Sequence, residues 1–256
     1  MRTYSITTTI AAVALAVSSC ATKQHYAVSS VERSRILIDS RYDSQPDAEA
    51  AAFLAPYKST VDSLMNPVMG EAACDMSANR PESRLSNLLA DILVWSSSQF
   101  GETPDFAVYN MGGIRASLSK GKVTRGNILD VAPFENKICF LTLKGSDVQQ
   151  LFSEIAKVGG EGVSHAIRLE ISSDGKLLSA LVNGKPVDPS ANYRIATLDY
   201  LAQGNDHLDA FKLKTDVLAP SAEENNVRHL IEKYFMNAAA NGQPVKAEVE
   251  GRITVK

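Results

Sequence analysis

A glycine turn that ends in an arginine is the first candidate for chemistry in this chain. It spans residues 110–115, with the sequence NMGGIR. Two successive glycines let the backbone turn tightly or approach a ligand closely, and the planar fork of donors on Arg115 suits a phosphate or a carboxylate. No Gly-Lys-Ser/Thr follows, so the segment is not a Walker phosphate loop. On these residues alone, an ordinary surface turn is the more common interpretation.

An aromatic residue beside polar groups is the second candidate. Phe134 follows a proline and precedes Glu135 and Asn136. An exposed ring of this kind offers a flat π-face on which another ring can stack. It can equally be a core side chain that lies in a loop, and for a lone phenylalanine the core interpretation is the better one.

This sequence has few residues that could serve as ligands of a catalytic metal. Residues 204–207 read Gly-Asn-Asp-His, a permuted form of the Gly-Asn-His-Asp motif of metallophosphoesterases, but the order differs and no Asp-x-His occurs. A pair of hydrolytic metals needs several ligands close together. The four histidines stand at unrelated spacings: His25, His165, His207 and His229. We therefore expect no metal site and no cofactor in this chain.

The composition excludes several other classes of protein. The chain has 256 residues, 45% of them hydrophobic and 21% charged, with a net charge of −3. These values are typical of a globular protein with a core. The slightly acidic balance argues against nucleic-acid binding, which needs a basic face. Three cysteines are too few for a disulfide scaffold, and Cys74 and Cys139 either pair or pack as small apolar groups.

The N-terminal residues have the features of a targeting segment. Residues 1–19 combine a basic start, a short apolar run and small residues, as secretory signals do. The sequence VSSC at residues 17–20 resembles a bacterial lipobox, which implies cleavage and lipidation at Cys20. We expect a lipid-anchored protein of the bacterial cell envelope, facing the periplasm or the surface, with residues 20–46 as a tether. An ordinary signal peptide is the alternative.

Residues 47–256 carry the patterns of a mixed α and β domain. Helical spacing begins at Asp47, and Pro56 should either bend that helix or delay its start. The pair Asn183-Gly184 predicts a tight hairpin, and Ser221 with Glu224 predicts a capping box before a helix. The other expected helices lie at 82–97 and 148–155, and the expected strands at 105–109, 138–143, 167–171, 193–198 and 249–255.

Four motifs in this order resemble the C-terminal domain of the 5′-nucleotidase family, which includes UDP-sugar hydrolases and cyclic-nucleotide phosphodiesterases. The motifs are ESRLSNLLAD at 82–91, NMGGIR at 110–115, PFEN at 133–136 and DYLAQGNDH at 199–207. The resemblance covers about 210 residues, essentially everything after the tether. It implies an α+β fold, a single layered α/β domain with a four-layer α/β/β/α arrangement.

The same resemblance implies a nucleotide site. In the family this domain holds the nucleotide, while an N-terminal metallophosphatase domain binds two metals and hydrolyses the phosphate. By resemblance, Phe134 and Tyr200 sandwich the base and Asn136 meets its edge. Arg115 then faces the phosphate, and Asp206 faces the ribose hydroxyls.

The resemblance adds three further residues to the expected site. Asn110 shapes the glycine turn, Gly204 belongs to the ligand loop, and Arg80 matches a substrate arginine in a register uncertain by one residue.

The sequence also departs from the family pattern. Side chains replace family glycines at five positions: Ser86, Met111, Glu135, Asn205 and His207. Such replacements alter the nucleotide clamp where the family lets the backbone approach its ligand.

We expect a nucleotide- or nucleoside-recognising domain that contributes substrate binding to hydrolysis by a separately encoded metallophosphoesterase. Divalent metals are expected only in that partner, since the catalytic domain would precede residue 47. The alternative is a stand-alone, non-catalytic lipoprotein that binds a nucleotide or another small molecule. A structural remnant with a degenerate site is the third possibility. No nucleophile, general base or metal cluster is visible, so an enzyme acting alone is not expected.

Overall fold

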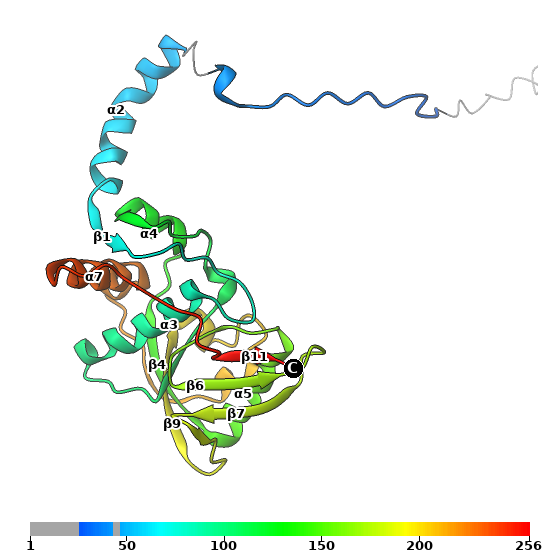
Figure 1. The fold of residues 1–256 in the computed structure, drawn as a ribbon, viewed down its shortest axis with the longest axis vertical. Coiled ribbons are helices and arrows are strands. Elements are labelled where there is room, and N and C mark those ends of the chain that lie inside the picture. Colours follow the sequence, from blue (N-terminus) through cyan, green and yellow to red (C-terminus); the bar gives the residue numbers. More distant parts are fainter. Residues whose placement is uncertain (1–25, 43–46) are drawn as a thin grey trace, which may run out of the picture. The chain divides into compact units, whose positions relative to one another are not determined.

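The computed structural model describes residues 26–42 and 47–256. The predicted signal segment and Cys20 lie outside the described residues. The described residues fall into two units that divide after Ala51, and the second unit covers residues 52–256. The second unit contains all the strands of the described part, and the colours of Figure 1 follow the chain from its N-terminus to its C-terminus.

Helix α2 (Ala48–Met65) confirms the helical pattern that follows Asp47. It continues through Pro56, so the proline neither delays nor ends it. None of its residues is buried. Its apolar stripe is at least half exposed, at Phe53 68%, Tyr57 62%, Val61 53% and Leu64 50%. Among the described residues, no helix is both long and apolar enough to span a membrane.

The larger sheet has the strand order β10-β4-β9-β2-β5. Strands β4 and β9 pair antiparallel along their whole length, whereas β2 lies parallel to β9. Every residue of β2 is buried, as expected for a strand inside a sheet that is covered on both faces. The strands predicted at 105–109, 138–143 and 193–198 are thereby confirmed. The bounds are β2 (Phe106–Tyr109), β4 (Ile138–Lys144), β5 (Gly162–Val163), β9 (Asn192–Leu198) and β10 (Thr215–Leu218).

A four-stranded sheet has the order β11-β6-β7-β8, and a separate pair joins β1 to β3. Asn183 and Gly184 make the tight turn between β7 and β8 with φ angles of 50° and 74°, which confirms the predicted hairpin. The predicted strand 249–255 was too long. It begins only at Ile253, because Gly251 has a φ of 72° that interrupts the extended backbone. The bounds are β1 (Val68–Ala72), β3 (Gly121–Thr124), β6 (Ile167–Ile171), β7 (Leu177–Val182), β8 (Lys185–Pro186) and β11 (Ile253–Val255).

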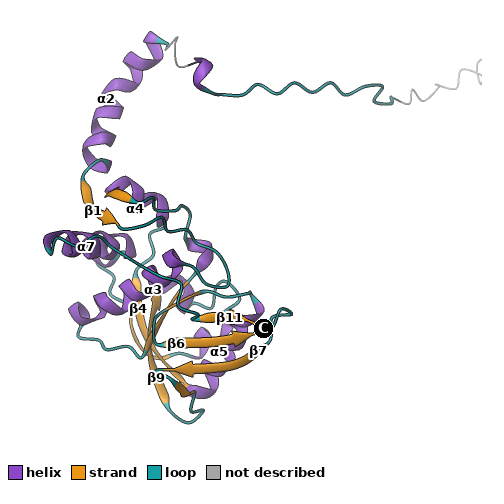
Figure 2. Ribbon diagram, in the orientation of Figure 1, coloured by secondary structure: helices purple, strands orange, loops and turns teal. Residues whose placement is uncertain are grey.

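Helices cover these sheets and complete the predicted layered α+β class (Figure 2). Helix α3 (Arg84–Ser96) packs on β2, β5 and β9 and also contacts α7 (Val227–Ala240), while α5 (Gly145–Lys157) contacts strands of both sheets. The apolar stripe predicted for α3 is fully in the core: Leu85, Leu88, Leu89, Ile92 and Leu93. Two shorter helices are α4 (Arg125–Val131) and α6 (Asp199–Ala202).

The start of α7 corrects the predicted capping box. Asn226, not Ser221, is the N-cap, and its side chain accepts from the N–H of Arg228 at 3.0 Å. Asn226 also bridges to Lys137 through the backbone, so a contact distant in sequence decides where the helix begins. Glu224 lies in a 3-10 turn before it.

The two cysteines of the described part are free thiols. Cys139 is buried on β4, and burial raises the pKa of its thiol to about 11. It packs as a small apolar group.

Candidate ligand-binding site

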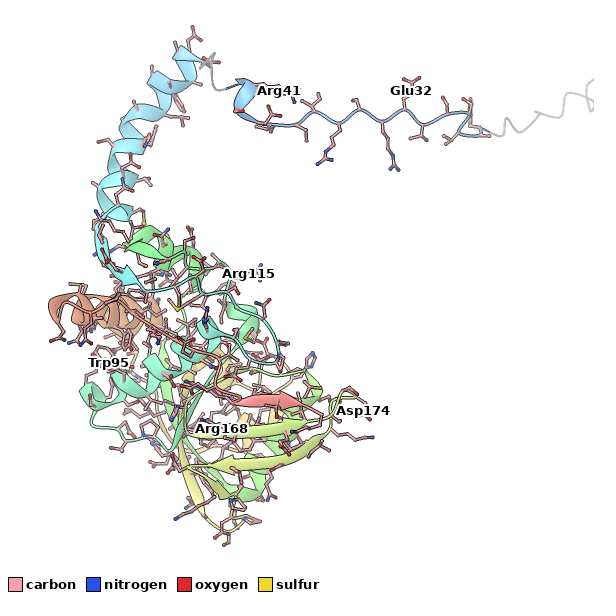
Figure 3. All side chains as sticks on the ribbon, in the orientation of Figure 1. Glu32, Arg41, Trp95, Arg115, Arg168 and Asp174 are labelled. Carbon is pink, nitrogen blue, oxygen red and sulfur yellow. The ribbon has the colours of Figure 1, made fainter. Side chains whose placement is uncertain are left out.

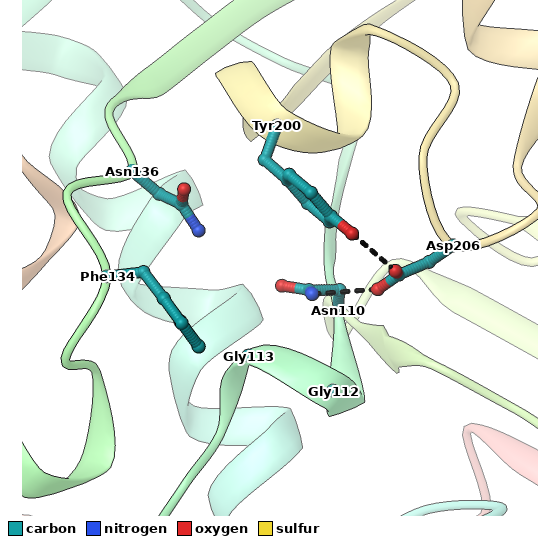
Figure 4. A pocket seen from close by; sticks show the side chains of 7 residues that line it. All are labelled: Asn110, Gly112, Gly113, Phe134, Asn136, Tyr200 and Asp206. Atoms are coloured by element: carbon teal, nitrogen blue, oxygen red, sulfur yellow. Dashed lines mark hydrogen bonds between the residues drawn. The ribbon is translucent and has the colours of Figure 1, made fainter.

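A pocket with a volume of about 200 Å³ lies in the second unit (Figure 4). It collects residues from the turn after β2, the loop between α4 and β4, and the segment that begins with α6. The lining residues are Asn110, Gly112, Gly113, Phe134, Asn136, Tyr200 and Asp206. Sites that enclose a drug-sized ligand measure roughly 300–1,000 Å³. This pocket therefore suits one flat group, with the rest of a ligand outside it.

Phe134 and Tyr200 lie on opposite sides of the pocket (Figure 4). Phe134 is 49% exposed in the loop before β4, and Tyr200 is 36% exposed in α6. Such exposure rules out the core interpretation of Phe134 that the sequence left open. Two partly exposed aromatic faces form a slot in which a flat ring can stack.

Asp206 connects one wall of this slot to its floor. Its Oδ1 accepts from the hydroxyl of Tyr200 at 2.8 Å, and its Oδ2 accepts from Nδ2 of Asn110 at 2.8 Å (Figure 4). The hydrogen bond to Asp206 raises the pKa of Tyr200, because the neutral phenol is the form that donates it. The carboxylate thus fixes the orientation of the Tyr200 ring.

Asn110 forms the floor of the pocket, and its side chain has a hydrogen-bond acceptor without a partner. It directly follows β2 and is only 4% exposed. Its Oδ1 has no hydrogen-bond partner in the described part of the chain. A buried acceptor without a partner is costly, so Oδ1 is a position for a donor of the ligand. A Cβ at Gly113 would lie 2.6 Å from this oxygen, which explains why glycine is needed there.

Two predicted residues neighbour the pocket without lining it. Arg115, labelled in Figure 3, is exposed. Its Nη1 donates to the carbonyl of Gly112 at 3.3 Å, which places the guanidinium beside the glycine turn. Gly204 has a φ of 83°, and a Cβ there would lie 2.5 Å from Cε of Lys212. The flexible side chain of Lys212 could move aside, so the positive φ is the reason that glycine is favoured at this position.

Arg80 does not line the pocket and forms an ion pair with Glu161. Its Nε also donates to the carbonyl of Val158 at 3.0 Å. The side chain of Glu161 is completely buried and accepts a second hydrogen bond, from the N–H of Met111 in the glycine turn. Glu161 was missed by sequence reasoning, because a single glutamate after two glycines carries no local pattern. Its hydrogen-bond partners, Met111 and Arg80, lie about 50 and 80 residues away from it in the sequence.

The backbone of the ligand loop is strained at His207. Asp206 and His207 have φ angles of 56° and 64°; aspartate visits this region readily, whereas for histidine it costs roughly 1–2 kcal/mol. His207 is exposed and does not line the pocket. It stands where the family pattern has a glycine, so the loop keeps a glycine-like backbone without the glycine.

We expect His207→Gly to raise the free energy of unfolding by about 0.5–1 kcal/mol, because the relief of strain exceeds the added chain entropy of glycine. Urea unfolding measures the change. Asn183→Gly in the β7–β8 turn, where φ is 50°, is the matched control and should gain less, since asparagine visits this region more readily. An equal gain in the control would contradict strain at His207.

The site offers binding groups without a metal centre. Within residues 26–42 and 47–256, no three His, Cys, Asp or Glu side chains gather in a position to hold a metal ion. An aromatic slot, an unused buried acceptor and a fixed carboxylate are the features of a small-molecule-binding domain.

The family of this domain is established by comparison with known proteins. The family model described as "5'-nucleotidase, C-terminal domain" matches residues 65–213, more than half of the chain, and the chain belongs to this family. The prediction from the four motifs is confirmed.

Several relatives extend this similarity. Protein UshA of Yersinia enterocolitica is 30% identical over 211 residues, which cover 79% of this chain and 38% of UshA. The cell wall protein Lmo0130 of Listeria monocytogenes is 25% identical over 236 residues, 82% of this chain and 30% of the relative. The crystal structure of a 5′-nucleotidase precursor from Thermus thermophilus superimposes with a TM-score of 0.70 and 27% identity, covering 83% of this chain and 44% of that one. The chain therefore spans less than half the length of these relatives.

Proposed function

We propose that this domain recognises a nucleotide or nucleoside by stacking its base between Phe134 and Tyr200. The aromatic slot is the observation that carries the proposal, since a planar base has the shape and the π-faces that such a slot binds. Asn136 lines the same pocket and has an amide that can pair with the base edge. The unused Oδ1 of Asn110 would accept from an N–H or O–H of the ligand.

The sugar and phosphate are proposed to extend out of the pocket. Asp206 lies at one side of the slot, where its carboxylate could meet ribose hydroxyls through the lone pairs not used by Tyr200 and Asn110. Arg115 stands beside the glycine turn at the surface, where its guanidinium would face an outer phosphate. Arg80 is not part of this proposal, because its guanidinium is paired with Glu161.

We propose further that the domain supplies substrate binding to a separate metallophosphoesterase, which hydrolyses the nucleotide phosphate. Two observations support this division of labour: the family to which the chain belongs is named for 5′-nucleotidase, and the described part of the chain has binding groups but no cluster of metal ligands. Divalent metals would then act in the partner, by activating water against the phosphate.

The proposed location is the bacterial cell envelope, with a lipid on Cys20. The N-terminal sequence supports it through its signal-like and lipobox-like residues. A relative named as a cell wall protein supports the same location.

Calorimetric titration with adenosine and with AMP tests the binding proposal directly. We expect saturable binding of both ligands by the purified chain. If neither binds, the proposed recognition is wrong.

Release of inorganic phosphate from AMP tests the division of labour. The chain with manganese or zinc should release no more phosphate than its metal-free control, and it should accelerate a secreted metallophosphoesterase that lacks this domain. Hydrolysis by the chain alone would contradict the proposal. Ligand binding without any effect on such an enzyme would instead favour a stand-alone binding lipoprotein.

A further inference from the structure

Glu161 is a buried carboxylate behind the pocket that stacking and base recognition do not use. Its side chain has no exposed surface. It accepts hydrogen bonds from two donors, the backbone N–H of Met111 and the guanidinium of Arg80. Met111 stands between Asn110 and Gly112, which both line the pocket. The carboxylate therefore holds the pocket floor from behind.

The segments around Glu161 are locked against one another, so this carboxylate is a fixed anchor. Arg80 donates through Nε to the carbonyl of Val158 at 3.0 Å. Gly160 has a φ of 111°, and a Cβ there would lie only 2.4 Å from the carbonyl oxygen of Pro81. Gly160 therefore packs tightly against the backbone of Pro81, and Glu161 directly follows it in the chain.

The electrostatic surroundings of Glu161 place its change of charge near neutral pH. Burial raises the pKa of Glu161 to about 7; the N–H of Met111 and the charge of Arg80 oppose this shift, and the charge of Asp206 adds to it. When the carboxylate is protonated, one oxygen becomes a donor. Arg80 and Met111 donate to different oxygens of Glu161, so the oxygen that takes the proton loses acceptor capacity and the hydrogen bond it accepts weakens.

We propose that Glu161 is a positioning residue that makes ligand binding depend on pH, because the ionised carboxylate holds the Asn110–Gly113 turn in its binding geometry and the protonated acid releases it. This inference rests on the proposed recognition of nucleosides. Its sign is fixed: if the ligand prefers the ionised form, affinity rises with pH, and binding near neutral pH releases a proton.

Calorimetry with adenosine at about pH 6 and about pH 8 tests the inference, since adenosine has no group that titrates in this range. We expect binding about three- to tenfold tighter at the higher pH, the value of one hydrogen bond. Glu161→Gln should bind with the same affinity at both pH values. His207→Asn is the control, because His207 directly follows Asp206 but does not line the pocket; this variant should keep the slope.

A second measurement decides the question even if Glu161→Gln does not fold. Adenosine binding to the unmodified chain at about pH 7, in two buffers of different ionisation enthalpy, should show proton release. Adenosine binding without a pH slope or proton release would overturn the role of Glu161 alone. A slope lost in His207→Asn would also overturn it. No adenosine binding at any pH would overturn the proposed function, and this inference with it.

Discussion

Replacing Phe134 with alanine should weaken adenosine binding by about 5- to 140-fold. Stacking on an aromatic side chain contributes roughly 1–3 kcal/mol per base, and each 1.4 kcal/mol corresponds to about a tenfold change in affinity. The ring is 49% exposed, so its removal leaves no cavity in the core and the fold should be retained. Calorimetry gives the affinity, and a thermal melt checks the fold.

The matched control for this variant is Phe53→Ala. Phe53 lies on α2 and is 68% exposed, and its ring contacts that of Tyr57. Its removal should leave adenosine affinity unchanged. Tyr200→Ala should lose at least as much affinity as Phe134→Ala, because it also frees Asp206 from one of its donors. Equal affinity of Phe134→Ala and the unmodified chain would remove the slot from the proposed site.

Asp91→Ala should lower the free energy of unfolding by about 2–3 kcal/mol. Arg252 has a side chain that is 3% exposed, and its Nη1 and Nη2 donate to the two oxygens of Asp91 at 2.9 and 2.6 Å. Removing one partner of a buried pair typically costs roughly 3–5 kcal/mol. The loss is smaller here for two reasons: the side chain of Asp91 is 37% exposed, and Arg252 keeps Glu250 as a second partner at 3.0 Å. The melting temperature should fall by about 4–12 °C.

Glu248→Ala is the matched control for this stability prediction. Glu248 also pairs with an arginine, Arg84 at 3.2 Å, but both side chains are more than 40% exposed. An exposed pair contributes roughly 0–1 kcal/mol, so the control should melt close to the unmodified chain. Similar losses in Asp91→Ala and Glu248→Ala would contradict the role of burial at Arg252.

Local patterns predicted the elements whose signals are local. The apolar stripe of α3, the buried strands β4 and β9 and the Asn183-Gly184 hairpin follow from side-chain periodicity and turn chemistry. The start of α7 could not be predicted in this way. Ser221 and Glu224 have the spacing of a capping box, but the helix begins at Asn226, which pairs with the chain near Lys137.

The candidate site was also predictable only in part. Motif resemblance selected Phe134, Asn136 and Tyr200, and the folded chain brings them to one pocket. It could not reveal that Arg80 is paired with Glu161, because that ion pair joins two loops with no shared pattern. The motif at 82–91 illustrates a third case. It was recognised as a family feature, but the pairing of its Asp91 with Arg252 emerges only in three dimensions.

The hydrogen bond between Tyr200 and Asp206 makes one wall of the slot, the ring of Tyr200, more rigid than the other wall, the ring of Phe134. The Tyr200 ring is held in place before any ligand arrives, so the entropy of ordering it is lost during folding and not during binding. Phe134 is a hydrocarbon with half its surface in water, and no hydrogen bond can restrict the rotation of its ring. Ligands with rings of different width would therefore be accommodated by movement of Phe134, while Tyr200 sets the plane in which every one of them lies.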